Sequence, residues 1–174
     1  MGEEARKRAT DASRTWLEQL SQKKPATDEA VWIGGFFATI CQSSLCISRI
    51  QDGCVFCSFR VPAHLTDEDE NWQPGAIATL IDNVGAAAIM TTEGVIKVSV
   101  EFAISYFSPA KLNEEVEIDA RVVEHKGKKL TAVLVEIRKK QGGHLVAVGR
   151  QWMTSGRSLP TESARERINT NSRL

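Results

Sequence analysis

The most apolar stretch of the chain is GAIATLIDNVGAAAIM, residues 75–90. Pro74 suits the first turn of a helix, and apolar residues lie on nearly every side, so the pattern predicts a buried helix over residues 75–91. Asp82 lies in the middle of this helix, next to Asn83. An unpaired carboxylate is costly in such a place. Either a partner neutralises Asp82, or the carboxylate takes part in chemistry.

Segments on both sides of this helix alternate between apolar and polar residues, which is typical of strands. Two of them flank an Asp-Gly turn, and four follow the helix, joined mostly by tight turns that contain glycine. In chain order the segments are LCISRI, CVFCSFRV, IKVSVEFAISYF, EEVEIDARVVEH, KLTAVLVEIRKK and HLVAVGRQWMT. This order predicts an α+β fold, ββαββββ, in which an antiparallel sheet packs around one central helix.

The two ends of the chain differ from the middle in composition. Residues 3–24 are charged and Ala-rich with a thin apolar stripe, which predicts a peripheral helix. The last residues are polar and contain Pro160, which is typical of a flexible tail. We therefore expect a helical extension at 1–25, a single domain at 26–156 and a tail at 157–174.

Composition excludes several classes of protein. The chain has 174 residues, enough for one domain, and 22 basic residues balance 22 acidic ones. No net charge therefore favours nucleic acid or an anionic membrane as a partner. No apolar run is expected to reach the length of a membrane span, and the charged N-terminus argues against a signal peptide.

The four cysteines predict no metal site. Cys54 and Cys57 form a C-x-x-C pair, but on a strand residues i and i+3 point to opposite faces. Cys41 and Cys46 do not match zinc spacing either. All four cysteines are therefore expected to be reduced thiols without a metal, which favours an intracellular protein.

The start of the central helix adds a second candidate group. Gly75 offers an unobstructed backbone N–H at the positive end of the helix dipole, where a developing oxyanion could be stabilised. Asp82, two turns further on, could act as general base or nucleophile. Small residues share its helix face, namely Gly75, Ala78, Thr79, Gly85 and Ala86. They either let the sheet approach closely or leave room for a ligand.

The segments ATLIDN and VSVEFAISYFSPAKL resemble the hotdog-fold acyl-CoA thioesterases, especially the acyl-coenzyme A thioesterase 13 branch. The resemblance covers roughly residues 45–155 and implies hydrolysis of acyl-CoA without a cofactor. It also implies self-association as a dimer or tetramer, because one copy leaves a sheet edge unpaired.

Site residues follow from the same resemblance. It implies that Asp82 is the catalytic carboxylate, that Ser99 helps to hold the attacking water, and that the Gly75 N–H binds the thioester oxygen. Asp67 stands where the branch has an Asn in the preceding loop. Substrate contacts are expected from Gln73, Asn83, Tyr106, Ser108, Pro109, Lys111, Lys126, Gly127, Lys128 and Lys129.

One departure from the family pattern leaves an alternative open. The family opens the central helix with His-Gly-Gly, whereas this chain has Gln73-Pro74-Gly75. Proline has no N–H, so Gly75 must supply the oxyanion donor. The alternative is an acyl-CoA binding protein on the same fold, without turnover. A hotdog dehydratase is a weaker option, because no His is expected beside the helix.

The last three residues, Ser172-Arg173-Leu174, resemble the S-K-L peroxisomal signal. They predict binding to a peroxisomal import receptor and localisation in peroxisomes, with the cytoplasm as the alternative.

Overall fold

The structure is a computed structural model that describes residues 2–22, 45–126 and 130–155. Three predicted site residues, Gly127, Lys128 and Lys129, lie outside the described residues. So do the C-terminal tripeptide 172–174 and the boundaries proposed near residues 25 and 156. The expectations that depend on them remain predictions.

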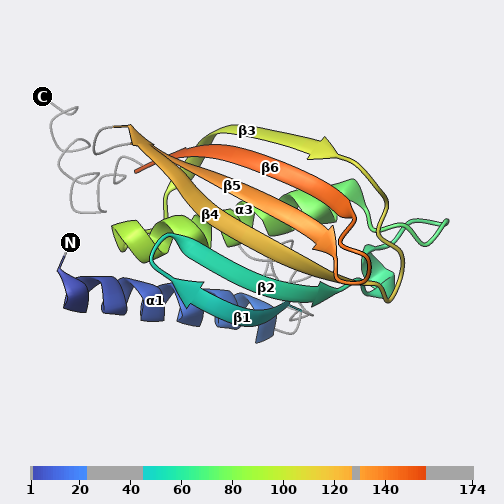
Figure 1. The fold of residues 1–174 in the computed structure, drawn as a ribbon, viewed down its shortest axis with the longest axis horizontal. Helices are drawn as coiled ribbons and strands as arrows, with labels where there is room; N and C mark the ends of the chain where they lie inside the picture. Colours follow the sequence, from blue (N-terminus) through green and yellow to red (C-terminus); the bar gives the residue numbers. More distant parts are fainter. Residues whose placement is uncertain (1, 23–44, 127–129, 156–174) are drawn as a thin grey trace, which may run out of the picture.

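Six strands form one antiparallel sheet in the order β1-β2-β4-β5-β6-β3 (Figure 1). The strands β3 and β1 are its two edges. This sheet and the helix on it confirm the predicted α+β class. The strands are β1 (Leu45–Gln51), β2 (Cys54–Arg60), β3 (Val98–Tyr106), β4 (Glu115–Lys126), β5 (Leu130–Lys139) and β6 (Leu145–Thr154).

The turn between β1 and β2 shows why the Asp-Gly pair is a good predictor. Gly53 has φ +74°, in the left-handed region that glycine adopts without strain. Its N–H donates to Thr91 Oγ1 on the central helix (2.7 Å). The turn is therefore joined to the helix as well as to its two strands.

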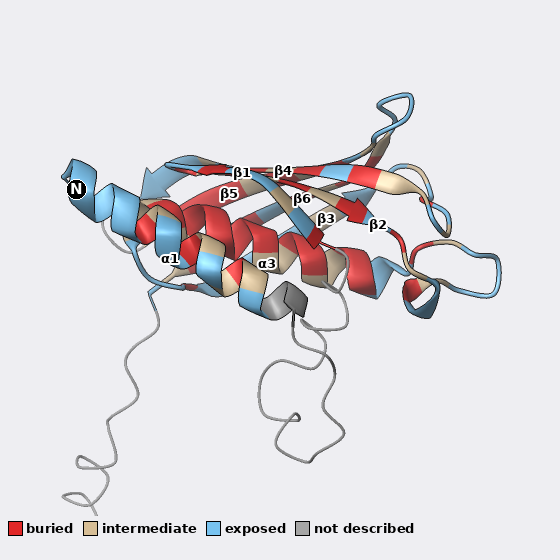
Figure 2. Cartoon of the chain, turned by 90° about the horizontal axis from the view of Figure 1, so that it is seen from below, coloured by how far each residue is buried: buried red, intermediate tan, exposed pale blue. Residues whose placement is uncertain are grey.

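The central helix is α3 (Pro74–Glu93), and it lies along one face of the sheet (Figure 2). It begins one residue before the predicted range and ends two residues after it, at Glu93. Gly94, whose φ is 75°, caps the helix. The apolar side chains that the pattern marked, such as Leu80 and Val84, are fully buried in the core. A short 3-10 helix, η2 (Ala63–Leu65), stands between β2 and α3.

By length and composition alone, α3 could cross a membrane, so the expectation that no segment reaches that length is wrong. The helix is apolar on nearly every side because it is a core helix. The protein itself buries 61% of its most apolar window.

The predicted peripheral helix is α1 (Glu3–Gln22), which packs against α3 (Figure 2). Leu17 is fully buried, and the Ser13 hydroxyl donates to the Ala87 carbonyl of α3 (2.7 Å). At the outer end, Arg6 pairs with Asp52 of the β1–β2 turn (3.1 Å). The central helix is thus covered by the sheet on one side and by α1 on another.

The C-x-x-C pair lies on β2, as predicted. Cys57 faces the core, and burial raises its pKa to about 12, so this thiol stays protonated at neutral pH.

Candidate functional site

Asp82 is half-buried, and two neutral donors converge on one of its oxygens. Ser99 on β3 donates its hydroxyl to Asp82 Oδ1 (2.9 Å), and Gln151 Nε2 on β6 donates to the same oxygen (2.5 Å). Gln151 Nε2 also lies 3.3 Å from Ser99 Oγ. Within the described part of the chain, no Lys or Arg pairs with Asp82. Hydrogen bonds to uncharged groups therefore hold this carboxylate.

The ladder between β3 and β6 brings these two donors together. Ser99 pairs with Met153, and a bulge between Ser99 and Glu101 shifts the register. Gln151 lies two residues before Met153, so its side chain points to the same face of the sheet. That face is the one packed on α3.

Gln151 is the residue of this group that the sequence analysis missed. The signal was present, since alternate positions of β6 are buried and Gln151 is one of them, between Gly149 and Met153. A polar residue on the inward face of a strand is informative because it must find a partner. Its partner, Asp82, is 69 positions away in the chain.

The start of α3 supplies the second group. Pro74 is the first helical residue, and no side chain caps the helix. As the second residue of the helix, Gly75 has an N–H without an intrahelical acceptor. A Cβ added at Gly75 would meet nothing within 4 Å, so the space in front of it is open.

Gly75 and Asp82 lie on the same side of α3 but at different heights along the helix. They are seven residues apart, and a rise of about 1.5 Å per residue puts their Cα atoms about 10 Å apart. The two groups therefore lie about two helical turns apart along α3 in one copy.

A cleft of about 330 Å³ lies beside the start of α3. Its lining includes the predicted residues Asp67, Tyr106, Ser108 and Pro109, with Trp72 and Ile77. The Tyr106 hydroxyl donates to the Pro74 carbonyl (3.1 Å), which ties the end of β3 to the start of α3. Burial raises the pKa of Tyr106 above its ordinary value of 10, so the hydroxyl keeps its proton at neutral pH.

Asp67 is engaged within its own loop. Its carboxylate accepts the backbone N–H groups of Asn71 (2.8 Å) and Asp69 (3.0 Å) and the Asn71 side-chain amide (3.3 Å). These hydrogen bonds, led by the Asn71 N–H, lower the pKa of Asp67 below 3.8. In this conformation Asp67 shapes the loop that lines the cleft.

Other predicted contact residues also have partners in the protein. Gln73 Nε2 donates to the Thr66 carbonyl (3.0 Å), and the Ser108 hydroxyl donates to the Leu145 carbonyl (2.6 Å). The Lys111 ammonium donates to the Asp69 carbonyl (2.8 Å). These bonds hold the walls of the cleft together.

Of the predicted substrate contacts that the structure describes, Gln73, Asn83, Lys111 and Lys126 do not line the cleft. Asn83 follows Asp82 on α3, and its Nδ2 is buried without a hydrogen-bond partner in the described residues. Lys126 is exposed at the end of β4. The structure thus gathers most of the described site residues into two groups, one around Asp82 and one at the helix start.

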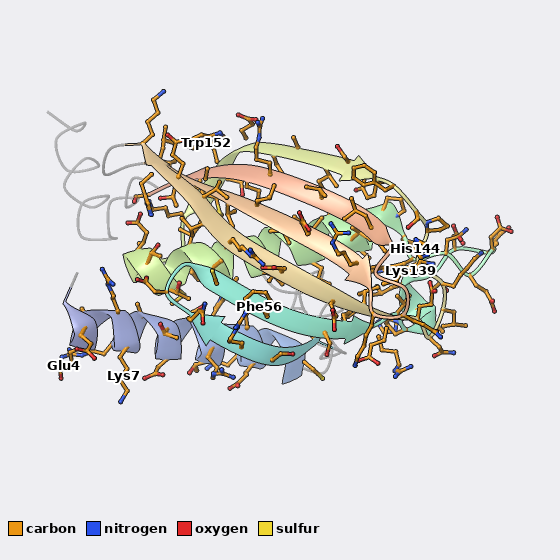
Figure 3. The ribbon with its side chains drawn as sticks, in the orientation of Figure 1. Glu4, Lys7, Phe56, Lys139, His144 and Trp152 are labelled. Atoms are coloured by element: carbon orange, nitrogen blue, oxygen red, sulfur yellow. The ribbon has the colours of Figure 1, made fainter. Side chains whose placement is uncertain are left out.

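A larger hollow, of about 430 Å³, lies on the outer face of the sheet. It is lined by Phe56, which points away from the buried face of β2 (Figure 3), and by mixed charges such as Arg49 and Glu117. None of the predicted site residues lines it. Its size alone does not make it the better candidate.

Comparison with known proteins identifies the family. The family model described as the thioesterase superfamily matches residues 74–146 of this chain. Human acyl-coenzyme A thioesterase 13 is 39% identical over 99 residues, which are 56% of this chain and 70% of that protein. The crystal structure of zebra fish thioesterase superfamily member 2 is 26% identical with a TM-score of 0.70, over 84% of this chain and 98% of that one.

A thioesterase protein from Streptococcus pneumoniae, solved with coenzyme A, shares the fold at 23% identity and a TM-score of 0.64, over 70% of this chain and 92% of that one. The relatives, the matched family model and the sheet on its central helix agree with one another. The chain therefore belongs to the thioesterase superfamily, a family of thioester hydrolases, and has the hotdog fold.

Proposed function

We propose that this protein hydrolyses acyl-CoA thioesters to the free acid and CoA, with Asp82 as the group that activates water or attacks directly. The observation that carries the proposal is the half-buried Asp82 carboxylate, held on one oxygen by Ser99 and Gln151. The name of the human relative, acyl-coenzyme A thioesterase 13, supports acyl-CoA as the substrate class. The coenzyme A bound to the Streptococcus pneumoniae protein is consistent with this substrate class.

In the general-base route, Asp82 takes a proton from water while the water oxygen bonds to the thioester carbonyl carbon. The carbonyl oxygen becomes an oxyanion, which the Gly75 N–H and the dipole of α3 stabilise. The carbon–sulfur bond then breaks, and the proton held by Asp82 goes to the CoA thiolate. In the nucleophilic route, an Asp82 oxygen bonds to the same carbon and the carbon–sulfur bond breaks, so that CoA leaves as a thiolate and an acyl–Asp82 anhydride forms. Water then hydrolyses the anhydride to the free acid and the Asp82 carboxylate, and the released proton goes to the CoA thiolate.

A second copy of the chain completes the site in this proposal. Because about 10 Å separates the Cα atoms of Gly75 and Asp82 in one copy, we infer that the two groups at one carbonyl come from different copies. The edge strand β3 carries Ser99 and leaves Val98, Val100 and Phe102 exposed. A two-fold pair joined at this edge would contain two identical sites. Assembly of such pairs into tetramers remains a prediction.

Substitution of Asp82 tests the chemistry. Asp82→Asn keeps the size of the side chain but removes the base and the nucleophile, so we expect kcat to fall at least about 10²-fold. CoA release from a panel of acyl-CoAs of different length and aromaticity is the measurement. Asp119→Asn, on the outer face of the sheet, is the matched control and is expected to keep wild-type turnover. Wild-type kcat in Asp82→Asn would refute the assignment.

Pro74 favours a second candidate function, binding of acyl-CoA without turnover. Its missing N–H removes one donor from the start of α3. The same panel separates the two functions. Saturable binding without CoA release for every acyl-CoA would support the binding protein, whereas release from any of them supports the hydrolase.

A further inference from the structure

We propose that Gln151 is a positioning residue that holds Asp82 Oδ1 in place and leaves Oδ2 free for the reacting water or carbonyl carbon. This inference rests on the proposed role of Asp82. Gln151 itself is fully buried, and its side chain reaches Asp82 and Ser99. It therefore acts through Asp82 and not on the substrate.

The amide of Gln151 has one favourable orientation. With Nε2 toward Asp82 Oδ1, the amide donates to a carboxylate oxygen. The reversed amide would place Oε1 against that oxygen, and two acceptors repel each other at hydrogen-bond distance. The network therefore determines which way the amide points.

The other end of the amide carries a cost in stability. Gln151 Oε1 is buried and has no hydrogen-bond partner among the described residues. An apolar side chain of similar size would fill this position without leaving an acceptor unpaired. A polar residue that is unfavourable for folding is expected mainly where function requires it.

Gly85 makes room for this arrangement. A Cβ at Gly85 would lie 2.4 Å from Gln151 Oε1, closer than two such atoms can approach. Because Gly85 has no side chain, the Gln151 amide fits between α3 and the sheet and reaches Asp82. A glycine inside a helix is otherwise unfavourable.

The two donors share one oxygen of Asp82. Ser99 and Gln151 both donate to Oδ1, and Oδ2 accepts no hydrogen bond from the described residues. The pair restricts rotation of the carboxylate, so that Oδ2 keeps a single direction. Small errors in the placement of a reacting group cost about 10²-fold in rate.

Kinetics of Gln151→Leu tests the inference. Because Gln151 is buried away from substrate, we expect kcat to fall about 10²-fold and KM to change less than about 3-fold. Gln141→Leu, an exposed glutamine in the turn before β6, is the matched control and is expected to leave both unchanged. Thermal unfolding checks that each variant is folded. A folded Gln151→Leu with wild-type kcat would overturn the inference.

A second test compares the effect of Gly85→Ala in two backgrounds, the wild type and Gln151→Ala. The added methyl group displaces the amide, so we expect a loss in kcat in the wild-type background. In a Gln151→Ala background no amide is present, and the added methyl group meets only Val133 and Val135 at 3.2 and 3.3 Å. The loss in kcat caused by Gly85→Ala should then be much smaller. Equal losses in the two backgrounds would contradict the inference, since Gly85 would then act by another route.

A spectroscopic readout separates this inference from the proposed function. The side-chain NH₂ signal of ¹⁵N-labelled Gln151, identified by its loss in Gln151→Leu, should shift in Asp82→Asn. An unchanged signal would contradict the hydrogen bond between Gln151 and Asp82, and with it the inference, even if the enzyme is active. A wild-type protein that releases no CoA would overturn the proposed function and the catalytic role of Gln151, whatever the NMR signal shows.

Discussion

At Gly149 the sheet and the central helix approach more closely than any side chain would allow. A Cβ at this position would lie 2.3 Å from Ile81 Cγ2. Ile81 immediately precedes Asp82, so this contact sets how deeply α3 sits against β6. The distance from Asp82 to its two donors depends on that depth.

We expect Gly149→Ala to lower the free energy of unfolding by about 1–3 kcal/mol, because the methyl group overpacks the contact with Ile81. In an Ile81→Ala background only the Cβ of residue 81 remains, at an ordinary contact distance of 3.5 Å, so the loss should shrink or reverse. Urea unfolding measures both. Gly75→Ala is the control for stability, since an added Cβ there meets nothing within 4 Å. The same loss in both backgrounds would show that the contact with Ile81 is not the cause.

At the scale of elements, the C-terminal end of α3 is joined to the sheet by a polar cluster. Glu93 pairs with the buried Lys97 (3.1 Å) and with His125 on β4 (3.2 Å). Thr131 on β5 donates to Glu93 (2.9 Å) and accepts from the Lys97 ammonium (2.9 Å). The cluster offsets the unfavourable position of an acidic residue at a helix C-terminus.

The pH dependence of stability should report on this cluster. Burial raises the pKa of Glu93, but hydrogen bonds from Thr131 and Lys97 outweigh it and hold the pKa below 4.5. A lowered folded-state pKa means that ionised Glu93 stabilises the fold above pH 4.5 and that this contribution disappears as the pH falls through the folded value.

We therefore expect Glu93→Gln to lose about 1–3 kcal/mol at neutral pH and progressively less in acid, measured by urea unfolding across a pH series. Glu124→Gln, on the exposed part of β4, serves as the control with no such pH-dependent difference. A loss in Glu93→Gln that is constant from neutral to acidic pH would contradict the role of the ionised carboxylate.

At the scale of the whole molecule, the edge strand β3 carries several exposed apolar side chains. Val100 is 58% exposed at the bulge of β3, and Val123 is 57% exposed at the bulge of β4, which is an inner strand. A free edge with exposed apolar residues is suited to pairing with another copy. The two valines differ in whether their strand lies at an edge.

We expect Val100→Lys to prevent the proposed two-fold pair from forming, because pairing at β3 would bring like charges together. Hydrolysis of acyl-CoA should fall with it, since the proposed site needs two copies. Val123→Lys should change neither. Light scattering at micromolar protein concentration gives the mass. A monomeric wild type, or a Val100→Lys that keeps the wild-type mass, would exclude this mode of assembly.

Local pattern was sufficient for the elements of this fold. Alternation predicted all six strands within one or two residues. Strands such as β2 and β6 alternate because one of their faces is buried, whereas the edge strand β3 has no buried residue. The apolar run predicted α3, because this helix is buried by the sheet and α1 together. A carboxylate inside an apolar helix and a glycine at the start of that helix identified Asp82 and Gly75 as candidate catalytic residues. The resemblance to a known family added Ser99. Contacts between Asp82 and Ser99 agree with that grouping.

Only the tertiary structure decided which distant residues meet. No local pattern places β3 beside β6, or β2 beside β4, since these pairings follow from how the sheet covers α3. The same packing brings Gln151 to Asp82 and requires glycine at positions 85 and 149. Periodicity in the sequence predicts which face of a helix or strand is buried. Which residue of a distant element contacts that face depends on how closely the two elements pack. That closeness is a property of the packed core.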